Sequence, residues 1–295
     1  MRSAVADDVS YRSNPHGYNQ YTGAGAQPRE PAPSPNARYG DHAPDQGVGS
    51  VRDQFHVYGQ PGEMAHQRDA NAYAGVEDAM QAIENAHPMP NFNGLSNKTP
   101  VTIDIESTMS PGQLGMYSPA MGGHIYLSST RPETADYQRP PRDRSSVALT
   151  TIHEMGHAMD FKSYGDNPGR KPGSSMPRNS PIGNGPMKAI KESPSVRAAK
   201  ENPPRTETRE PGVSKGSSMR DRARYDYLST PTELHARAYT QYVVSKQPPG
   251  SPLKAAFEGE RVKTTLLDKF HPTYWSDAEF KPIGKAYDEM FGAVK

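Results

Sequence analysis

The 295-residue sequence contains no cysteine. This absence excludes disulfide bonds, thiolate metal sites and cysteine nucleophiles, whatever the compartment. The sequence also lacks any apolar run near the roughly 18–20 residues that cross a bilayer, so no membrane span is expected. Its first residues contain no apolar segment of the kind found in secretory signals. We therefore expect either a cytoplasmic protein or one exported by a non-standard route, as an effector or virion component.

The sequence also has little net charge and few hydrophobic residues. The net charge of +1 gives no field that would attract nucleic acid or a membrane surface. Hydrophobic residues make up 33% of the chain, against about 45–50% in globular proteins. The sequence is instead rich in proline and glycine, with 30 and 26 residues. Because the first isoleucine is Ile83, we expect residues 1–67 to be a disordered arm, either a docking or tethering segment or a passive tail.

Periodic patterns begin near residue 68. Apolar residues recur at steps of three and four, which predicts a helix that stops before Pro88. Alternation over 101–106 predicts a half-buried strand, and 123–129 predicts a second one. The second strand either exposes an edge that could accept a peptide as an extra strand or lies inside the sheet. Residues 146–161 then predict another helix. Residues 68–295 are thus expected to form one small α+β domain.

Residues 162–224 interrupt this domain. They hold nine prolines and seven glycines, and their 14 Lys/Arg against 6 Asp/Glu give a net charge of +8. We interpret them as a flexible basic insertion, either simply solvated or serving as a substrate-facing lid or a docking site for an acidic partner. Regular patterns return at Thr230-Pro231-Thr232-Glu233, which has a helix start with Thr as N-cap, Pro at N1 and Glu at N3. Two further helices are expected at about 253–270 and 277–294.

The most informative segment is His153-Glu154-Met155-Gly156-His157 on the second predicted helix. Residues four apart lie on one helical face, so His153 and His157 can offer two imidazole nitrogens to one cation. Glu154 points about 100° away, beside the cation, where it could take a proton from metal-bound water. This is the spacing of zinc metallopeptidases. Gly156 costs helix stability, about 1 kcal/mol relative to Ala, which indicates close packing there.

Two histidines leave a catalytic zinc ion short of one protein ligand. We expect Glu233 to supply it, although the same residue could serve only in the helix cap. His235 is a weaker rival. Asp160 lies too far along the helix to join easily and is better interpreted as an acceptor that fixes an imidazole. Tyr227 or Tyr225, just before Glu233, could hydrogen-bond the oxyanion, or each could be a packing anchor.

These segments resemble the zincin metallopeptidases with a downstream Glu ligand, the gluzincins. The likeness is to the catalytic domain of anthrax lethal factor and related toxin or phage-borne peptidase domains. His153–Asp160 looks like their active-site helix, and Glu233–Tyr239 looks like their third-ligand helix. The resemblance implies a zincin-like fold, one Zn²⁺ ion held by His153, His157 and Glu233, Glu154 as general base and an upstream tyrosine at the oxyanion. The expected substrate is a protein or peptide.

Two other functions fit the same sequence. One is a zinc-binding structural or interaction protein with little turnover, although metal binding alone needs no base at Glu154. The other is an adaptor whose arm and basic insertion do the binding.

Overall fold

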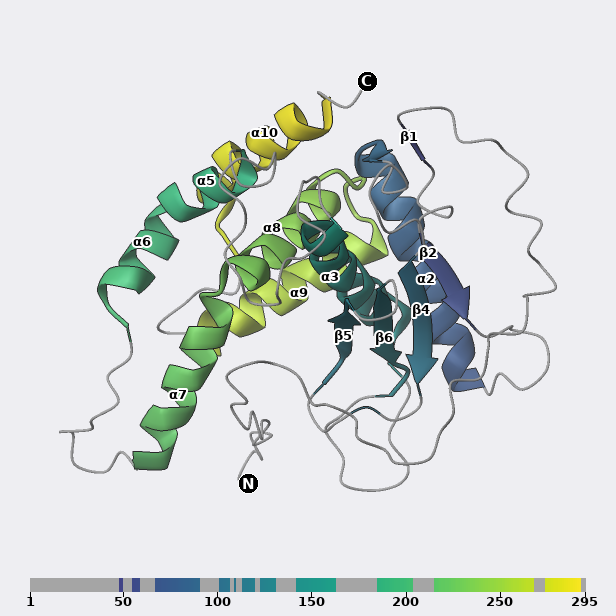
Figure 1. Ribbon diagram of the computed structural model, residues 1–295, viewed down its shortest axis with the longest axis horizontal. Coiled ribbons are helices and arrows are strands. Elements are labelled where there is room, and N and C mark those ends of the chain that lie inside the picture. Colours follow the sequence, from purple (N-terminus) through teal and green to yellow (C-terminus); the bar gives the residue numbers. More distant parts are fainter. Residues whose placement is uncertain are drawn as a thin grey trace.

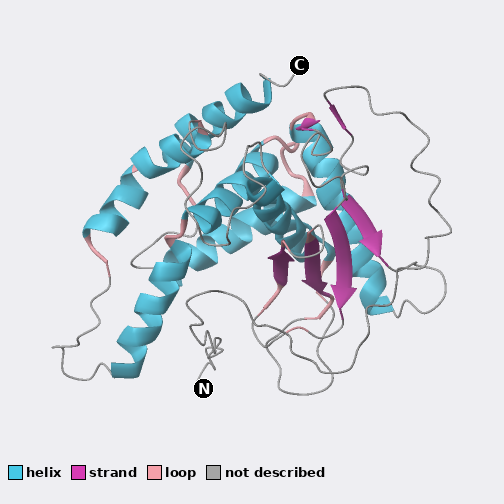
Figure 2. Cartoon of the chain, in the orientation of Figure 1, coloured by secondary structure: helices cyan, strands magenta, loops and turns pink. Residues whose placement is uncertain are grey.

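The structure of the protein is a computed structural model, and it describes residues 48–49, 55–58, 67–90, 101–106, 109, 113–119, 123–130, 142–162, 185–203, 215–267 and 274–292. Its helices are α2 (Gln67–Ala86), α3 (Arg144–Lys162), α5 (Pro186–Glu192), α6 (Pro194–Glu201), α7 (Lys215–Leu228), α8 (Pro231–Ser245), α9 (Pro252–Leu267) and α10 (Asp277–Gly292). Its strands are β1 (Val48–Gly49), β2 (Phe55–Tyr58), β3 (Met89–Pro90), β4 (Val101–Glu106), β5 (Gly115–Ser118) and β6 (His124–Ser128). The fold is mixed α+β and mostly helical (Figure 1, Figure 2).

Four strands form one sheet in the order β2-β4-β6-β5. The first three are parallel, whereas β5 runs antiparallel to β6 at the end of the described sheet. Side chains alternate between the two faces of a strand, so one face collects the apolar residues. That face is 2% exposed or less at Phe55, Val101, Ile103, Ile125 and Leu127. A separate short ladder joins β1 to β3.

Helix α3 is the centre of the packing. It contacts α2, α8 and α9 among the helices and β5 and β6 in the sheet, and Figure 1 shows it between the sheet and α8. Its residues Ile152, Met155 and Met159 are fully buried. The predicted helix at 146–161 is thus confirmed within two residues at each end, and so is the helix that ends before Pro88. The residues of the His-Glu-x-x-His motif therefore lie on a helix that packs against both the sheet and the neighbouring helices.

The strand predictions are confirmed in position, and the structure decides between the two arrangements left open for the second strand. β6 matches the predicted strand at 123–129 within one residue at each end. It is an internal strand, because β4 pairs with one side of it and β5 with the other. Among the described strands, β5 is the terminal strand on this side of the sheet, and its four residues are too few for their pattern to be recognised in the sequence.

The boundary of the predicted arm also needs correction. Most of residues 1–67 lie outside the described part of the chain, but Val48–Gly49 and Phe55–Tyr58 form strands. β2 pairs in parallel with β4, and Phe55 is 2% exposed. Four residues are too few to show a periodic pattern, and the segments on either side are rich in glycine and proline. The sequence therefore carries no signal for this strand.

The basic insertion differs from its description as a pattern-free segment. Within 162–224 the structure describes α5, α6 and the start of α7, and Met187 and Ile190 of α5 are fully buried. Pro186 and Pro194 stand in the first turn of α5 and α6. Proline is well tolerated there because the first amides of a helix have no intrahelical partner. The prolines of this segment were interpreted as interruptions of regular structure, but two of them begin helices.

The C-terminal helices begin where the sequence predicts. The hydroxyl of Thr230 accepts a bond from the backbone N–H of Glu233, and a proline stands in the first turn of α8. Ser276 caps α10 in the same way, accepting from the backbone N–H of Glu279 at 3.4 Å. Helix α9 matches the expectation with an end three residues earlier. In the described part of the chain, no helix is long and apolar enough to cross a membrane.

A buried histidine stabilises the contact between the end of α2 and the C-terminal helices. His87 is 5% exposed and stacks on Phe291 with ring centroids 3.5 Å apart. Its Nδ1 lies 2.9 Å from the carbonyl of Pro88, which only accepts, so Nδ1 donates and Nε2 accepts from the hydroxyl of Tyr239 at 2.8 Å. The ring is therefore neutral, and burial lowers its pKa to about 4 despite the carbonyl bond.

This pKa makes folding stability depend on pH. Between pH 6.5 and about 4 the unfolded chain binds a proton at His87 that the native protein does not bind. Stability is therefore complete above pH 6.5 and falls toward pH 4 by up to about 3 kcal/mol from this group. Urea unfolding of wild type and His87→Gln from pH 7.5 to 4.5 measures it. The His87→Gln protein should lose less stability on acidification, and equal losses in the two proteins would contradict the assignment.

Candidate metal centre

Two histidines of α3 face helix α8. His153 and His157 stand one turn apart, and their rings meet edge to face with centroids 4.9 Å apart. Their side chains are 18% and 15% exposed, so each remains within reach of solvent. The helical spacing of four residues thus produces the shared face that the sequence predicts.

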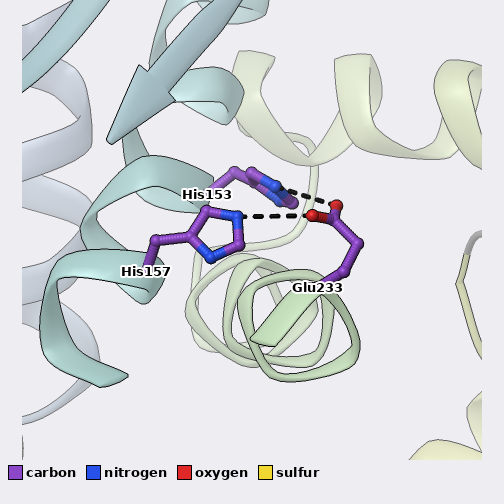
Figure 3. Close-up of side chains that lie close together, drawn as sticks. All are labelled: His153, His157 and Glu233. Atoms are coloured by element: carbon purple, nitrogen blue, oxygen red, sulfur yellow. Dashed lines mark ion pairs between the residues drawn. The ribbon is translucent and has the colours of Figure 1, made fainter. Parts of the chain in front are cut away.

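The third group of the centre comes from the start of α8. Glu233 is 4% exposed, and its carboxylate faces both imidazoles (Figure 3). Oε1 lies 3.1 Å from Nε2 of His153, and Oε2 lies 3.3 Å from Nε2 of His157. The backbone N–H of Glu233 donates to Thr230 in the helix cap. The two interpretations of Glu233 are therefore compatible, because the cap uses its backbone and leaves its carboxylate for the histidines.

The spacing of these atoms fits a metal ion. His153, His157 and Glu233 offer two nitrogens and one oxygen that lie within 4.8 Å of one another, so the group could hold a cation. Tetrahedral zinc binds such ligands at 2.0–2.2 Å, which puts two ligand atoms about 3.4 Å apart. The nitrogen–oxygen distances of 3.1 and 3.3 Å, each to a different carboxylate oxygen, are close to that value. The three side chains therefore lie close enough together to share one ion.

Charge explains why these three side chains stay together in the protein. Burial alone would raise the pKa of Glu233, but the charges and hydrogen bonds of His153 and His157 lower it well below its usual range. Burial lowers the pKa of His157, and this is outweighed by its hydrogen bond to Glu233 and by the nearby carboxylates, which bring the pKa to about 9. A carboxylate with a lowered pKa facing an imidazole with a raised pKa forms an ion pair, which holds the three side chains together.

Glu154 lies beside this group, on the side of the sheet. It is 6% exposed, and burial raises its pKa, with the charge of Glu233 acting in the same direction. The histidines lower the pKa of Glu154, as does the backbone N–H of Tyr117, which donates to the carboxylate. The charges of His153, His157 and Glu233 therefore all affect the pKa of Glu154, although Glu154 is not one of the three candidate metal ligands.

The approach of α3 to α8 depends on Gly156. A Cβ atom at this position would lie 3.0 Å from the Cα of Ala236 and 3.2 Å from a ring carbon of Tyr239. Those distances are tighter than ordinary contacts, and one of them is to backbone. The close packing that the sequence predicts at Gly156 is confirmed, and it brings His153 and His157 within reach of Glu233.

Two other residues named in the sequence analysis lie near the centre but outside it. Asp160 is 1% exposed, and its charge raises the pKa of His157, so it lies close to that ring without joining the metal group. His235 is fully buried, and its Nδ1 lies 2.9 Å from the hydroxyl of Tyr287. This contact directs His235 toward α10 and away from His153 and His157.

The two candidate oxyanion tyrosines lie on α7 and differ in environment. Tyr225 is 9% exposed, and its hydroxyl donates to the carbonyl of Ala199 at 2.8 Å. Tyr227 is 42% exposed. The structure therefore ties Tyr225 to α6 and leaves Tyr227 facing solvent near the start of α8.

Two groups of residues border this centre without any signal in the sequence. Burial and the charges of Glu260 and Glu233 raise the pKa of the Tyr274 phenol, which is thus close to the centre although it is 41 residues beyond Glu233 in the sequence. Gly115 and Tyr117 of β5 also border Glu154. No local pattern pointed to them, because their proximity arises only from the pairing of β5 with β6 and the packing of β5 on α3.

Comparison with known proteins gives no relative. No protein-family profile matches the chain, and neither a curated protein nor a solved structure is similar to it. Any function assigned to the chain is therefore argued from its own residues.

The raised pKa of His157 predicts how metal binding depends on pH. A metal ligand must be deprotonated, so a cation must displace the proton from His157, whose pKa is about 9. We expect metal binding at pH 7 to release about one proton and the apparent affinity to rise about tenfold per pH unit below pH 9. Zinc titration by calorimetry in buffers of different ionisation enthalpy measures both. Binding without proton release would contradict this description of the centre.

Proposed function

We propose that the protein is a zinc-dependent metallopeptidase that hydrolyses peptide bonds. The observation that carries the proposal is the position of Glu154, a buried carboxylate next to two imidazoles and a carboxylate that are spaced for one ion. A site that only bound metal would gain nothing from a second acid there, because burying it without a salt bridge is costly. Zinc suits two imidazoles and a carboxylate, and it leaves a position open for substrate.

In this proposal each residue has a separate task. His153, His157 and Glu233 would hold the ion, which when bound would supply a water of lowered pKa and a Lewis acid for the scissile carbonyl. Glu154 would accept a proton from the attacking water and return it to the leaving amine. Burial raises the pKa of Glu154, which makes its carboxylate a stronger base for the first of these steps. The hydrogen bond from Tyr117 keeps the carboxylate in one orientation.

The sheet edge offers a place for the substrate chain. The carbonyl of Leu114 accepts from the N–H of Ser128, so alternate residues of β5 direct their backbone groups toward β6. The backbone groups of Gly115 and Tyr117 then point away from β6, toward the side on which the Tyr117 N–H meets Glu154. An extended peptide that adds to this edge would lie beside Glu154. We therefore propose an unfolded or extended peptide segment as the substrate.

The proposal is tested by separating metal binding from turnover. Glu154→Gln should keep one zinc ion per chain but lose activity by a factor of about 10² to 10⁴, because it cannot accept a proton. Glu233→Ala should lose both zinc and activity. Zinc content by mass spectrometry and cleavage of a mixed peptide library measure the two properties. Full activity of Glu154→Gln would refute the proposal, and a wild type that binds zinc but cuts nothing would instead support a structural or interaction role.

The oxyanion residue can be tested in the same assay. We propose Tyr227, which is 42% exposed and lies six residues before Glu233, whereas Tyr225 is buried against α6 and donates to Ala199. Tyr227→Phe should lower kcat by about 10- to 100-fold with normal stability. Tyr225→Phe should keep kcat but lose about 1 kcal/mol of stability through the lost hydrogen bond. Tyr274→Phe is the third comparison, and a drop in kcat confined to that variant would move the role to Tyr274.

A further inference from the structure

Gly115 stands where the edge strand β5 meets the metal-binding helix α3. A Cβ atom at this position would lie 2.6 Å from Cγ2 of Thr150 and 2.9 Å from both Cγ and Oε1 of Glu154. All three distances are shorter than real Cβ atoms show, so a side chain here would force a neighbour to move. The affected neighbours are Glu154 itself and the residue one turn before it.

Space rather than backbone conformation is the reason for this glycine. The positive-φ glycines of the described chain are Gly123 and Gly250, and Gly115 is not among them. Any residue could therefore adopt its extended backbone, and alanine would be tolerated if the surroundings were open. The missing Cβ matters because the volume that it would fill is occupied by the Glu154 side chain.

Neither the strand nor the helix can easily retreat. Arg142 is 1% exposed, and it donates to the carbonyl of Leu114 in front of β5 at 3.0 Å and to the carbonyl of Ser146 on α3 at 2.8 Å. It also donates to the hydroxyl of Thr150. One guanidinium thus fixes the strand, the helix and the Thr150 rotamer together. Glu154 is the part of the contact that would give way.

We propose that Gly115 is a positioning residue, whose missing side chain provides the space in which the Glu154 carboxylate stands between β5 and the histidines. The inference rests on the proposed function, in which Glu154 is the base. An added methyl group would push the carboxylate away from the Tyr117 N–H and from the metal centre. The proposed metal ligands would stay in place. The three atoms nearest to the added methyl group belong to Thr150 and Glu154, and not to the ligands.

The test compares Gly115→Ala with two further variants. Gly115→Ala/Thr150→Ser removes the methyl group in the 2.6 Å contact and keeps the hydroxyl that Arg142 binds, so it relieves strain on α3 but not on Glu154. Gly259→Ala is the matched control, because a Cβ atom at Gly259 of α9 meets nothing within 4 Å. For each protein we would measure zinc content, melting temperature, kcat and KM.

The expected pattern distinguishes positioning from stability. Gly115→Ala should bind one zinc ion, keep KM within about threefold and lose kcat by about 10- to 100-fold, since a shift of about 1 Å in a catalytic group can cost that much. The double variant should regain the melting temperature but not kcat. The control should match wild type in zinc content, kcat and KM, with a melting temperature at or slightly above that of wild type because alanine favours a helix. A kcat of Gly115→Ala within twofold of wild type, or a kcat that recovers with the melting temperature, would overturn the inference. If the single variant does not fold, the double variant carries the same test.

One readout does not require turnover. Hydrogen exchange of the Tyr117 amide, followed by NMR, reports its bond to Glu154. Gly115→Ala should exchange this amide at least tenfold faster than wild type, as Glu154→Ala should, with the Ile125 amide unchanged as a reference. If wild type cuts no peptide, the proposed function fails while the amide still tests the placement of Glu154. If wild type is active and the amide and kcat are unaffected in Gly115→Ala, only the role of Gly115 fails.

Discussion

The interaction on which this structure depends is the contact between the carboxylate of Glu233 and the imidazoles of His153 and His157. All three groups are largely enclosed, and an isolated charge in such a place is costly. The carboxylate keeps its charge because the histidines lower its pKa. The rest of the region is arranged to hold α3 and α8 at the separation that this contact needs. Gly156 allows that separation, and the Thr230 cap sets where α8 begins.

Helix α3 serves two neighbours with two different faces. His153 and His157 face α8, whereas Glu154, about 100° around the helix, faces β5. The ion-holding group and the proposed base are therefore on one rigid element but in two contacts. Arg142 fixes the second contact through Leu114, Ser146 and Thr150. Because the two contacts are separate, a substitution in β5 is expected to move the proposed base, Glu154, and to leave His153 and His157 in place.

Local signals in the sequence predicted the parts of the structure that depend on neighbouring residues. The spacing of His153 and His157 and the Thr230-Pro231 helix start each lie within a few positions, and each feature is present as expected. The close packing at Gly156 could be inferred because glycine is otherwise unfavourable inside a helix. What could not be inferred were the long-range relations. The four-residue strands β2 and β5 carry too little pattern to be found, and the prolines that open α5 and α6 look like breaks when counted rather than placed.

The same distinction between local and long-range order applies within the site. Glu154 could be found from its place in the motif, but the glycine that makes room for it and the amide that orients it lie 39 and 37 residues earlier, on a strand that the sequence did not reveal. Glu233 lies 76 residues after His157, yet it could be named as a candidate third ligand, because its carboxylate opens a recognisable helix whose residues Glu233–Tyr239 resemble a third-ligand helix. Distance along the chain is thus not what limits prediction. A residue with a distinctive chemical group in a recognisable local pattern can be assigned at any distance, whereas a residue whose contribution is the absence of a side chain can be recognised only when its neighbours in space are known.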